Sequence, residues 1–132
     1  MNKVDFKDWA GLSEKLSGGL HWDSLHKHLY ATDASVYRML PQAVAYPRDE
    51  KDLKHLIEFA TAHQIGLIPR TAGTSLAGQC VGEGIVVDLS RHFTSILHLD
   101  TDKQQVRLQP GVVRDELNLF LKPYGLFFGP NT

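Results

Sequence analysis

The chain has 132 residues, which is enough for one domain or for part of one. Apolar residues make up 42% and charged residues 22%, the balance of an ordinary globular protein. The chain has 14 Lys and Arg residues and 15 Asp and Glu residues, which gives a net charge of −1. This charge gives no basis for binding nucleic acid or an anionic membrane.

Residues 1–40 are predicted to form an N-terminal helical extension. Within residues 5–17, large apolar side chains recur at helical spacing, and Gly18 and Gly19 follow as a helix end (the apolar residues are Phe6, Trp9, Leu12 and Leu16). Residues 20–40 are expected to form short helical turns and loop. Residues 41–132 are predicted to form the second unit of the chain.

A compact βαβ unit is predicted from residue 43 onward. Residues 43–47 form a short strand, and Asp49 stands at a helix N-cap with Asp52 three residues later, as in a capping box. The helix then buries one face, and the charges of residues 47–55 are expected to point to solvent (the buried face is Leu53, Leu56, Ile57 and Ala60). Residues 66–69 form a second strand, expected beside the first with a right-handed crossover.

Three further strands and a helix are predicted downstream. Residues 84–90 read as a buried strand, and residues 95–100 and 104–110 form a hairpin around a turn at 100–103. A second amphipathic helix follows, ended by Pro123 and Gly125 (its apolar positions are Val113, Leu117, Phe120, Leu121 and Tyr124). The predicted fold class is therefore α/β (α+β), a βαβ unit followed by a small mixed sheet with flanking helices.

The final residues, 126–132, read as the start of another strand or crossing loop. We expect the domain to be truncated there, because two phenylalanines, Phe127 and Phe128, precede an unfinished turn. Exposed apolar groups and unpaired strand edges at this end favour self-association.

No apolar run approaches the roughly 18 residues of a membrane span, and the first residues lack the apolar core of a signal peptide. The single cysteine, Cys80, excludes an intrachain disulfide and fits a reducing compartment. We therefore expect a cytoplasmic protein without a transmembrane segment. Cys80 itself is expected to be a small buried side chain.

The sequence PRTAGTSLAG, residues 69–78, offers many backbone amides and almost no apolar bulk. Gly73 and Gly78 permit positive φ, and Arg70 supplies a cation. Hydroxyl groups come from three neighbours (Thr71, Thr74 and Ser75). Successive amides in such a turn can bind the oxygens of an anion such as phosphate. A plain Gly/Ser-rich surface loop accounts for the composition equally well.

Two common nucleotide motifs do not fit this loop. Gly73 and Gly78 have the spacing of a P-loop, but Gln79 and Cys80 stand where the lysine and the hydroxyl residue are required. Residues 82–87 contain two of the three glycines of a Rossmann fingerprint and lead directly into a strand.

Three histidines near the N-terminus are expected to be solvated surface residues and not metal ligands (His21, His26 and His28). His26 and His28 are two positions apart, so on a helix they point away from each other. His21 lies nearby, but no cysteine or paired carboxylate was found to complete a zinc pattern.

Several stretches of sequence, by their order and spacing along the chain, resemble the front half of the FAD-binding domain of the FAD-linked oxidase family. This is the PCMH-type fold shared with vanillyl-alcohol oxidase and para-cresol methylhydroxylase. The stretches are YPRDEKDL, IPRTAGTSLAG, GIVVDLSR and LQPGVVRDELNLFLKPYGLFFGPNT, within residues 30–132. The sequence TDAS at residues 32–35 is similar to a stretch common in the D-lactate dehydrogenase and glycolate oxidase group.

The resemblance implies that main-chain amides of the loop after the second strand hold the FAD diphosphate. By position the cradle is Thr71, Ala72, Gly73, Thr74 and Ser75, with Gly78 and Gln79 at its exit and Arg70 ordering the loop. Many members have glycines where this chain has Thr71 and Ala72, so we expect ordinary negative φ at Ala72. Thr74 stands where covalent members carry a flavin-bonding histidine, which predicts non-covalent FAD.

The implied activity is oxidation of a small 2-hydroxy acid such as D-lactate or glycolate. In relatives the catalytic base and the carboxylate-binding arginine lie far downstream, so no catalytic residue is assigned here. The isolated chain is expected to be inactive and to hold FAD weakly or not at all. Three alternatives remain: a split-enzyme subunit, a flavin-free interaction module, and a relative of the same fold such as UDP-N-acetylenolpyruvoylglucosamine reductase or a molybdenum-hydroxylase flavin subunit.

Overall fold

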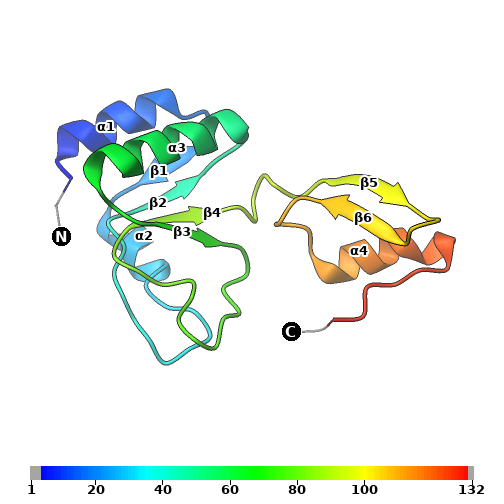
Figure 1. Cartoon of the computed structure of the whole chain (residues 1–132). Helices are drawn as coiled ribbons and strands as arrows, with labels where there is room; N and C mark the ends of the chain where they lie inside the picture. The colour runs from blue at the N-terminus through cyan, green and yellow to red at the C-terminus, as the bar shows by residue number, and fades with distance from the viewer. Residues whose placement is uncertain (1–3, 131–132) are drawn as a thin grey trace.

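The computed structural model describes residues 4–130 and arranges them in two lobes joined by the segment after β4 (Figure 1). The first lobe holds a four-stranded sheet with three helices, and the second holds a hairpin with one helix. The elements are α1 (Phe6–Lys15), β1 (Gly19–His21), α2 (Ser24–Leu29), β2 (Ala43–Tyr46), α3 (Glu50–His63), β3 (Leu67–Arg70), β4 (Ile85–Asp88), β5 (Ile96–Asp100), β6 (Gln105–Leu108), α4 (Arg114–Leu121) and a 3-10 helix (Lys122–Tyr124).

The main sheet has the strand order β1-β2-β4-β3. The two strands of the predicted βαβ unit, β2 and β3, are therefore not neighbours, and the expectation that they lie side by side is wrong. Both pair in parallel with β4, which lies between them and is buried at every position. An unbroken run of β-branched residues suits a strand covered on both faces, and β4 takes that central place.

Residues 19–21 form an edge strand where the sequence predicted only helical turns and loop. This strand, β1, pairs antiparallel with β2. Three residues are too few to show a strand period in the sequence. Trp9, Leu12 and Leu20 share one buried cluster with Leu56 and Ile85, so the first 40 residues contribute to the same core as the later strands.

Helices α1 and α3 lie side by side over one face of the main sheet (Figure 1). The predicted burial of α3 holds for Leu56 and Ala60, but Ile57 is 56% exposed. Phe59 is partly buried against the core, and its ring is tilted by 37° to that of Trp9, with 5.3 Å between the ring centroids. The buried stripe of α3 is thus rotated away from Ile57, toward the side that faces α1.

The carboxylate of Asp52 is the main departure from the predicted capping box. Asp49 does cap α3, since its Oδ1 accepts from the backbone amide of Asp52 at 2.9 Å. The Asp52 side chain is only 1% exposed, although the charges of this segment were expected to point to solvent. It accepts from the amides of Ser17, Gly18 and Arg48 at 2.8–2.9 Å and from Ser17 Oγ at 2.9 Å. These bonds tie the end of α1 and the start of β1 to α3.

The second lobe confirms the predicted hairpin, because β5 and β6 pair antiparallel with an irregularity between Ile96 and His98. On α4 only Leu117 and Leu121 of the predicted apolar face are buried, while Tyr124 is 54% exposed. A two-stranded sheet is too narrow to cover the whole helix face. Residues 126–130 form no strand, and residues 131–132 of the predicted strand or loop lie outside the described residues.

Asp52→Ala should lower the free energy of unfolding by about 3 kcal/mol, because three amides and a hydroxyl lose a buried charged acceptor. Urea unfolding at neutral pH measures this loss. Asp102→Ala removes an exposed aspartate from the β5–β6 turn and serves as the control, with little expected change. Equal losses in the two variants would contradict the role of Asp52.

The same carboxylate should make stability fall in acid. Burial opposes ionisation of Asp52, but the bonds from Arg48, Ser17 and Gly18 prevail and hold its pKa below the ordinary 3.8. Because the folded pKa is depressed, the stabilisation is present above 3.8 and is lost as pH falls through the folded value. The difference in stability between wild type and Asp52→Ala should therefore shrink below about pH 4.

Candidate functional site

Two long loops meet at the end of the sheet where the parallel strands terminate (Figure 1). One is the predicted diphosphate loop, which runs from the end of β3 to β4. The other connects α2 to β2 and contains residues 32–37. In open α/β sheets this carboxyl edge is the usual place for ligands.

Arg70, the last residue of β3, fixes the start of the diphosphate loop. Its Nη1 donates to the carbonyl of Thr32 at 2.7 Å, and its guanidinium lies 5.2 Å from the centre of the Tyr30 ring. The side chain also lies against Gly73, where a Cβ would come within 2.5 Å of Nη2. Gly73 has φ of +68°, so both the turn and the arginine require a glycine there.

Residues 33–37 hold the loop from its outer side. The amide of Ala34 donates to the carbonyl of Gly73 at 3.0 Å, and Asp33 Oδ2 accepts from the amide of Cys80 at 3.3 Å. Bonds from Ser35 lower the pKa of Asp33, and the Cys80 amide and the charge of Arg70 lower it further. Asp33 is thus an ionised acceptor that anchors the far end of the loop.

Ser75 braces the second half of the loop internally. Its Oγ accepts from the amides of Ala77 at 3.2 Å and Gln79 at 3.1 Å, and it donates to Gln79 Oε1 at 3.1 Å. Gln79 was predicted at the exit of the cradle, and its amide is already used within the loop. Gly78, at φ of +73°, packs against Tyr37.

The backbone amides of residues 71–75 differ from these later amides. Among the described residues, the hydrogen bonds of the loop leave these five amides without an acceptor. A hollow of about 740 Å³ adjoins them, lined by Thr71, Gly73, Thr74, Ser75, Leu76, Ala77, Gln79 and Cys80. Ala72 is not among the residues with positive φ, as predicted. Unpaired amides beside a hollow fit the oxygens of an anionic ligand.

Beneath the loop, Tyr30 and Asp88 form a polar contact that the sequence did not reveal. Tyr30 donates to Asp88 Oδ2 at 2.5 Å, and Asp88 also accepts from the amide and hydroxyl of Ser90. Burial, together with the bond to Asp88, raises the pKa of Tyr30 far above its ordinary value. Tyr30 therefore stays a neutral donor that supports Arg70 from below. The only sequence signal for this region was the TDAS stretch.

Cys80 is half-buried, not buried as expected, and lines the hollow.

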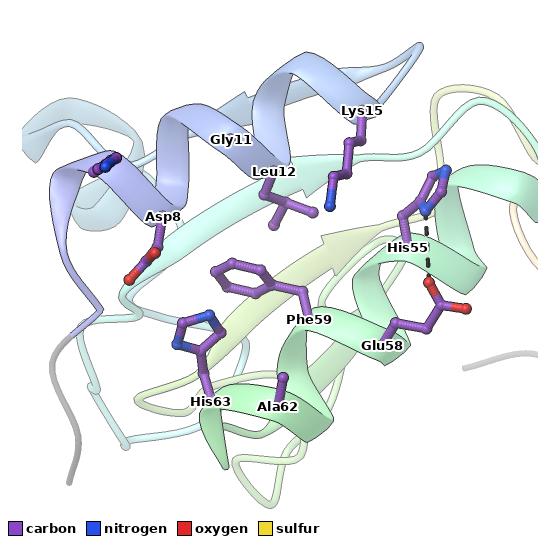
Figure 2. A pocket seen from close by; sticks show the side chains of 10 residues that line it. Asp8, Gly11, Leu12, Lys15, His55, Glu58, Phe59, Ala62 and His63 are labelled. Atoms are coloured by element: carbon purple, nitrogen blue, oxygen red, sulfur yellow. Dashed lines mark ion pairs between the residues drawn. The ribbon is translucent and has the colours of Figure 1, made fainter.

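A separate groove of about 410 Å³ lies between α1 and α3, where His55 and Glu58 form an ion pair at 3.7 Å (Figure 2). None of the predicted loop residues lines that groove. The two hollows are therefore distinct, and only the first contains the predicted residues.

The model of the FAD binding domain family matches residues 41–132. The chain therefore belongs to this family, and FAD is its cofactor. It is 48% identical over 103 residues to D-2-hydroxyglutarate dehydrogenase of Haemophilus influenzae, covering 76% of this chain and 10% of that enzyme. It is 36% identical over 93 residues to the mitochondrial D-lactate dehydrogenase [cytochrome] of Kluyveromyces lactis (67% and 16%) and 31% identical over 105 residues to glycolate oxidase subunit GlcD of Bacillus subtilis (78% and 22%).

Solved structures confirm the PCMH-type fold. Alkyldihydroxyacetonephosphate synthase matches with a TM-score of 0.76 at 16% identity, covering 98% of this chain and 27% of that one. p-Cresol methylhydroxylase matches with a TM-score of 0.74 at 14% identity, covering 93% and 26%. The chain thus spans about a tenth of the D-2-hydroxyglutarate dehydrogenase that it matches. Within residues 4–130, no helix is both long and apolar enough to cross a membrane.

Arg70→Met should loosen the loop while leaving the sheet intact. It removes the bond to the Thr32 carbonyl but keeps much of the side-chain volume, so we expect about 1–2 kcal/mol of lost stability. Hydrogen exchange at the hydrogen-bonded amides of Ala77, Gln79 and Cys80 should become faster than in the matched control Arg107→Met, which alters an exposed arginine of β6. Unchanged exchange in this segment would show that Arg70 does not order the loop.

Proposed function

We propose that this chain is the diphosphate-binding portion of an FAD-dependent dehydrogenase that oxidises a 2-hydroxy acid. The observation that carries the proposal is the set of unpaired amides at residues 71–75 beside an open hollow. Thr71, Ala72, Gly73, Thr74 and Ser75 would hold the diphosphate of FAD. Arg70, Gly78 and Gln79 would shape the loop around it.

The names of the relatives support the substrate class. Four D-2-hydroxyglutarate dehydrogenases match at 39–48% identity, above the glycolate oxidase and D-lactate dehydrogenases at 26–36%. We therefore place 2-hydroxyglutarate ahead of D-lactate and glycolate as the substrate of the complete enzyme. FAD, when bound, supplies the two-electron acceptor for this oxidation.

Several properties follow for the chain itself. No catalytic residue is assigned within the chain, so we propose that the chain alone is inactive. Thr74 cannot bond the flavin ring, which supports non-covalent FAD. The single cysteine supports a cytoplasmic location.

We propose that the second lobe associates with another protein surface, which could be that of a second copy of the chain. Leu97 is 56% exposed, Leu119 72% and Phe127 80%. Exposed apolar groups that join into one patch are typical of surfaces that bind another polypeptide.

Thr74→Glu should weaken FAD binding at least about tenfold, because it puts a carboxylate in the hollow where the diphosphate would lie. Thr74 is exposed, so the fold should be unaffected. Thr101→Glu makes the same charge change in the β5–β6 turn and should leave binding unchanged. Isothermal titration of the FAD-depleted complete gene product with FAD at low salt measures both. Equal affinities in the two variants would contradict the assignment of the loop.

The substrate class is tested on the complete gene product with an artificial electron acceptor. D-2-hydroxyglutarate should be oxidised more efficiently than D-lactate or glycolate, and L-2-hydroxyglutarate should serve as the inactive control. Oxidation of NADPH without any hydroxy-acid activity would instead favour a flavin reductase of the same fold.

A further inference from the structure

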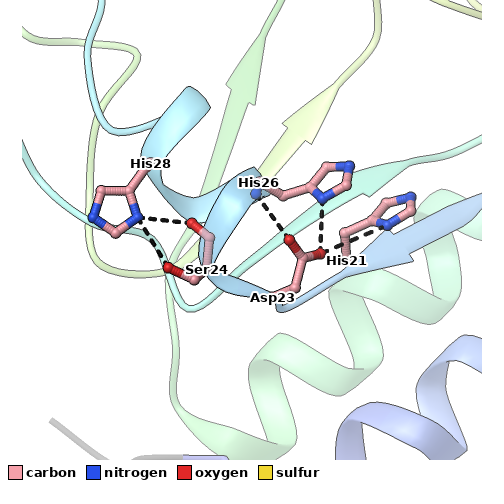
Figure 3. A network of polar contacts seen from close by, with 5 residues as sticks. All are labelled: His21, Asp23, Ser24, His26 and His28. Atoms are coloured by element: carbon pink, nitrogen blue, oxygen red, sulfur yellow. Dashed lines mark hydrogen bonds and ion pairs between the residues drawn. The ribbon is translucent and has the colours of Figure 1, made fainter.

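Two imidazoles and one carboxylate meet where β1 leads into α2 (Figure 3). His21 is the last residue of β1, Asp23 is the N-cap of α2, and His26 lies in the first turn of that helix. Asp23 Oδ1 accepts from the backbone amide of His26 at 3.1 Å, while its Oδ2 lies 2.7 Å from His26 Nδ1 and 4.0 Å from His21 Nδ1. The helix cap therefore fixes the carboxylate between the two rings.

We expected no metal here because His26 and His28 diverge on a helix, but the cluster in the structure is a different one. His26 and His28 do point apart, and His28 Nδ1 lies 2.7 Å from the carbonyl of Ser24 instead (Figure 3). The relevant pattern is His-x-Asp-x-x-His over residues 21–26. It was missed because β1 was not predicted, so nothing in the sequence brought His21 to the helix.

We propose that His21, Asp23 and His26 form a binding site for a divalent transition-metal ion of the Zn²⁺ type, with water completing the coordination. One ligand atom from each residue lies within 4.8 Å of the other two. Metal–ligand bonds of about 2.1 Å place tetrahedral ligand atoms about 3.4 Å apart, between the two Nδ1–Oδ2 separations found here. Two imidazoles and a carboxylate select Zn²⁺, Co²⁺ or Ni²⁺ over Mg²⁺ and Ca²⁺.

A bound ion would require a small rearrangement of one ring. The two imidazoles are stacked, with centroids 3.9 Å apart and 11° between their planes, so their nitrogen lone pairs run side by side. His21 must turn about its Cβ–Cγ bond to aim Nδ1 at an ion beside Asp23. The proton shared by His26 and Asp23 leaves to solvent when the ion binds. His21 is partly exposed at a sheet edge, which leaves room for this turn.

The surroundings set the strength and the effect of the site. Tyr46 packs edge-on against both rings, at 5.5 Å from His21 and 6.3 Å from His26, and backs the site on one side. Arg91 lies over the same tyrosine at 3.8 Å, and its positive charge opposes a cation there. An ion bound to His21 and His26 would link β1 to α2 directly, so binding should stabilise the first lobe. The site shares no residue with the diphosphate loop.

The test is calorimetric titration of the tag-free 132-residue chain with Zn²⁺ and Co²⁺ at neutral pH. We expect one ion per chain, a rise in Tm with Zn²⁺, and no competition from excess Mg²⁺. The double variant His21→Ala/His26→Ala should weaken the affinity at least about tenfold. His28→Ala should bind as the wild type does, and Arg91→Gln should bind more tightly.

NMR of the histidine rings makes the test independent of the stability of the variants. On adding Zn²⁺ to wild type, the ring signals of His21 and His26 should shift together, while those of His28 stay in place. Binding that survives in the double variant, ring shifts confined to other histidines, or no binding at millimolar Zn²⁺ would each overturn the proposal.

Discussion

The diphosphate loop is held by atoms outside its own first half, and this is what leaves its amides available. Arg70 is fastened to the Thr32 carbonyl, and the Gly73 carbonyl accepts from Ala34. A loop that ordered itself through bonds among its own peptide groups would spend the donors that an anion needs. In the first half of the loop the ordering contacts use carbonyls and side chains, while the amides of residues 71–75 keep their hydrogen-bonding capacity. The proposed binding of the diphosphate thus depends on the docking of residues 32–37.

That docking depends in turn on the sheet edge formed by β1. The buried carboxylate of Asp52 fixes Ser17 and Gly18, and β1 begins at the next residue. From β1 the chain enters α2, which ends at Tyr30 beside Asp88 and just ahead of the segment that clasps the loop. The Asp52 contact lies on the face of the sheet that α1 and α3 cover. Through β1 and α2 it helps to position the diphosphate loop at the carboxyl edge of the sheet. The segment that links them, residues 17–37, precedes the family match, which begins at residue 41.

Local signals in the sequence predicted most elements but not how they assemble. The cap at Asp49, the buried strand β4 and the β5–β6 hairpin were predictable because caps, apolar runs and turn residues act over a few positions. The insertion of β4 between β2 and β3 was not, because strand order depends on which faces of a sheet are covered. The burial of Asp52 was hidden for a similar reason, since three of its four donors come from residues 34 or 35 positions away.

The candidate site shows the same division. The family resemblance predicts residues 70–79 as the diphosphate loop, and Gly73 and Gly78 adopt the positive φ that the composition permits. Neither the composition nor the family resemblance could distinguish the free amides of residues 71–75 from the amides of Ala77 and Gln79. The latter two already donate to the Ser75 hydroxyl. The Ser75 hydroxyl comes within hydrogen-bonding distance of those two amides only in the folded loop. The supporting pair of Tyr30 and Asp88 likewise joins positions 58 residues apart.

The most direct measurement of the central claim is a two-dimensional amide NMR spectrum of the ¹⁵N-labelled chain titrated with inorganic pyrophosphate. Pyrophosphate isolates the anionic group from the adenine and flavin rings, so only contacts to the diphosphate are tested. The account predicts progressive downfield shifts of the amide protons of residues 71–75, with those of Ala77 and Gln79 changing little. Shifts that cluster on another surface while the amides of residues 71–75 stay in place would contradict it.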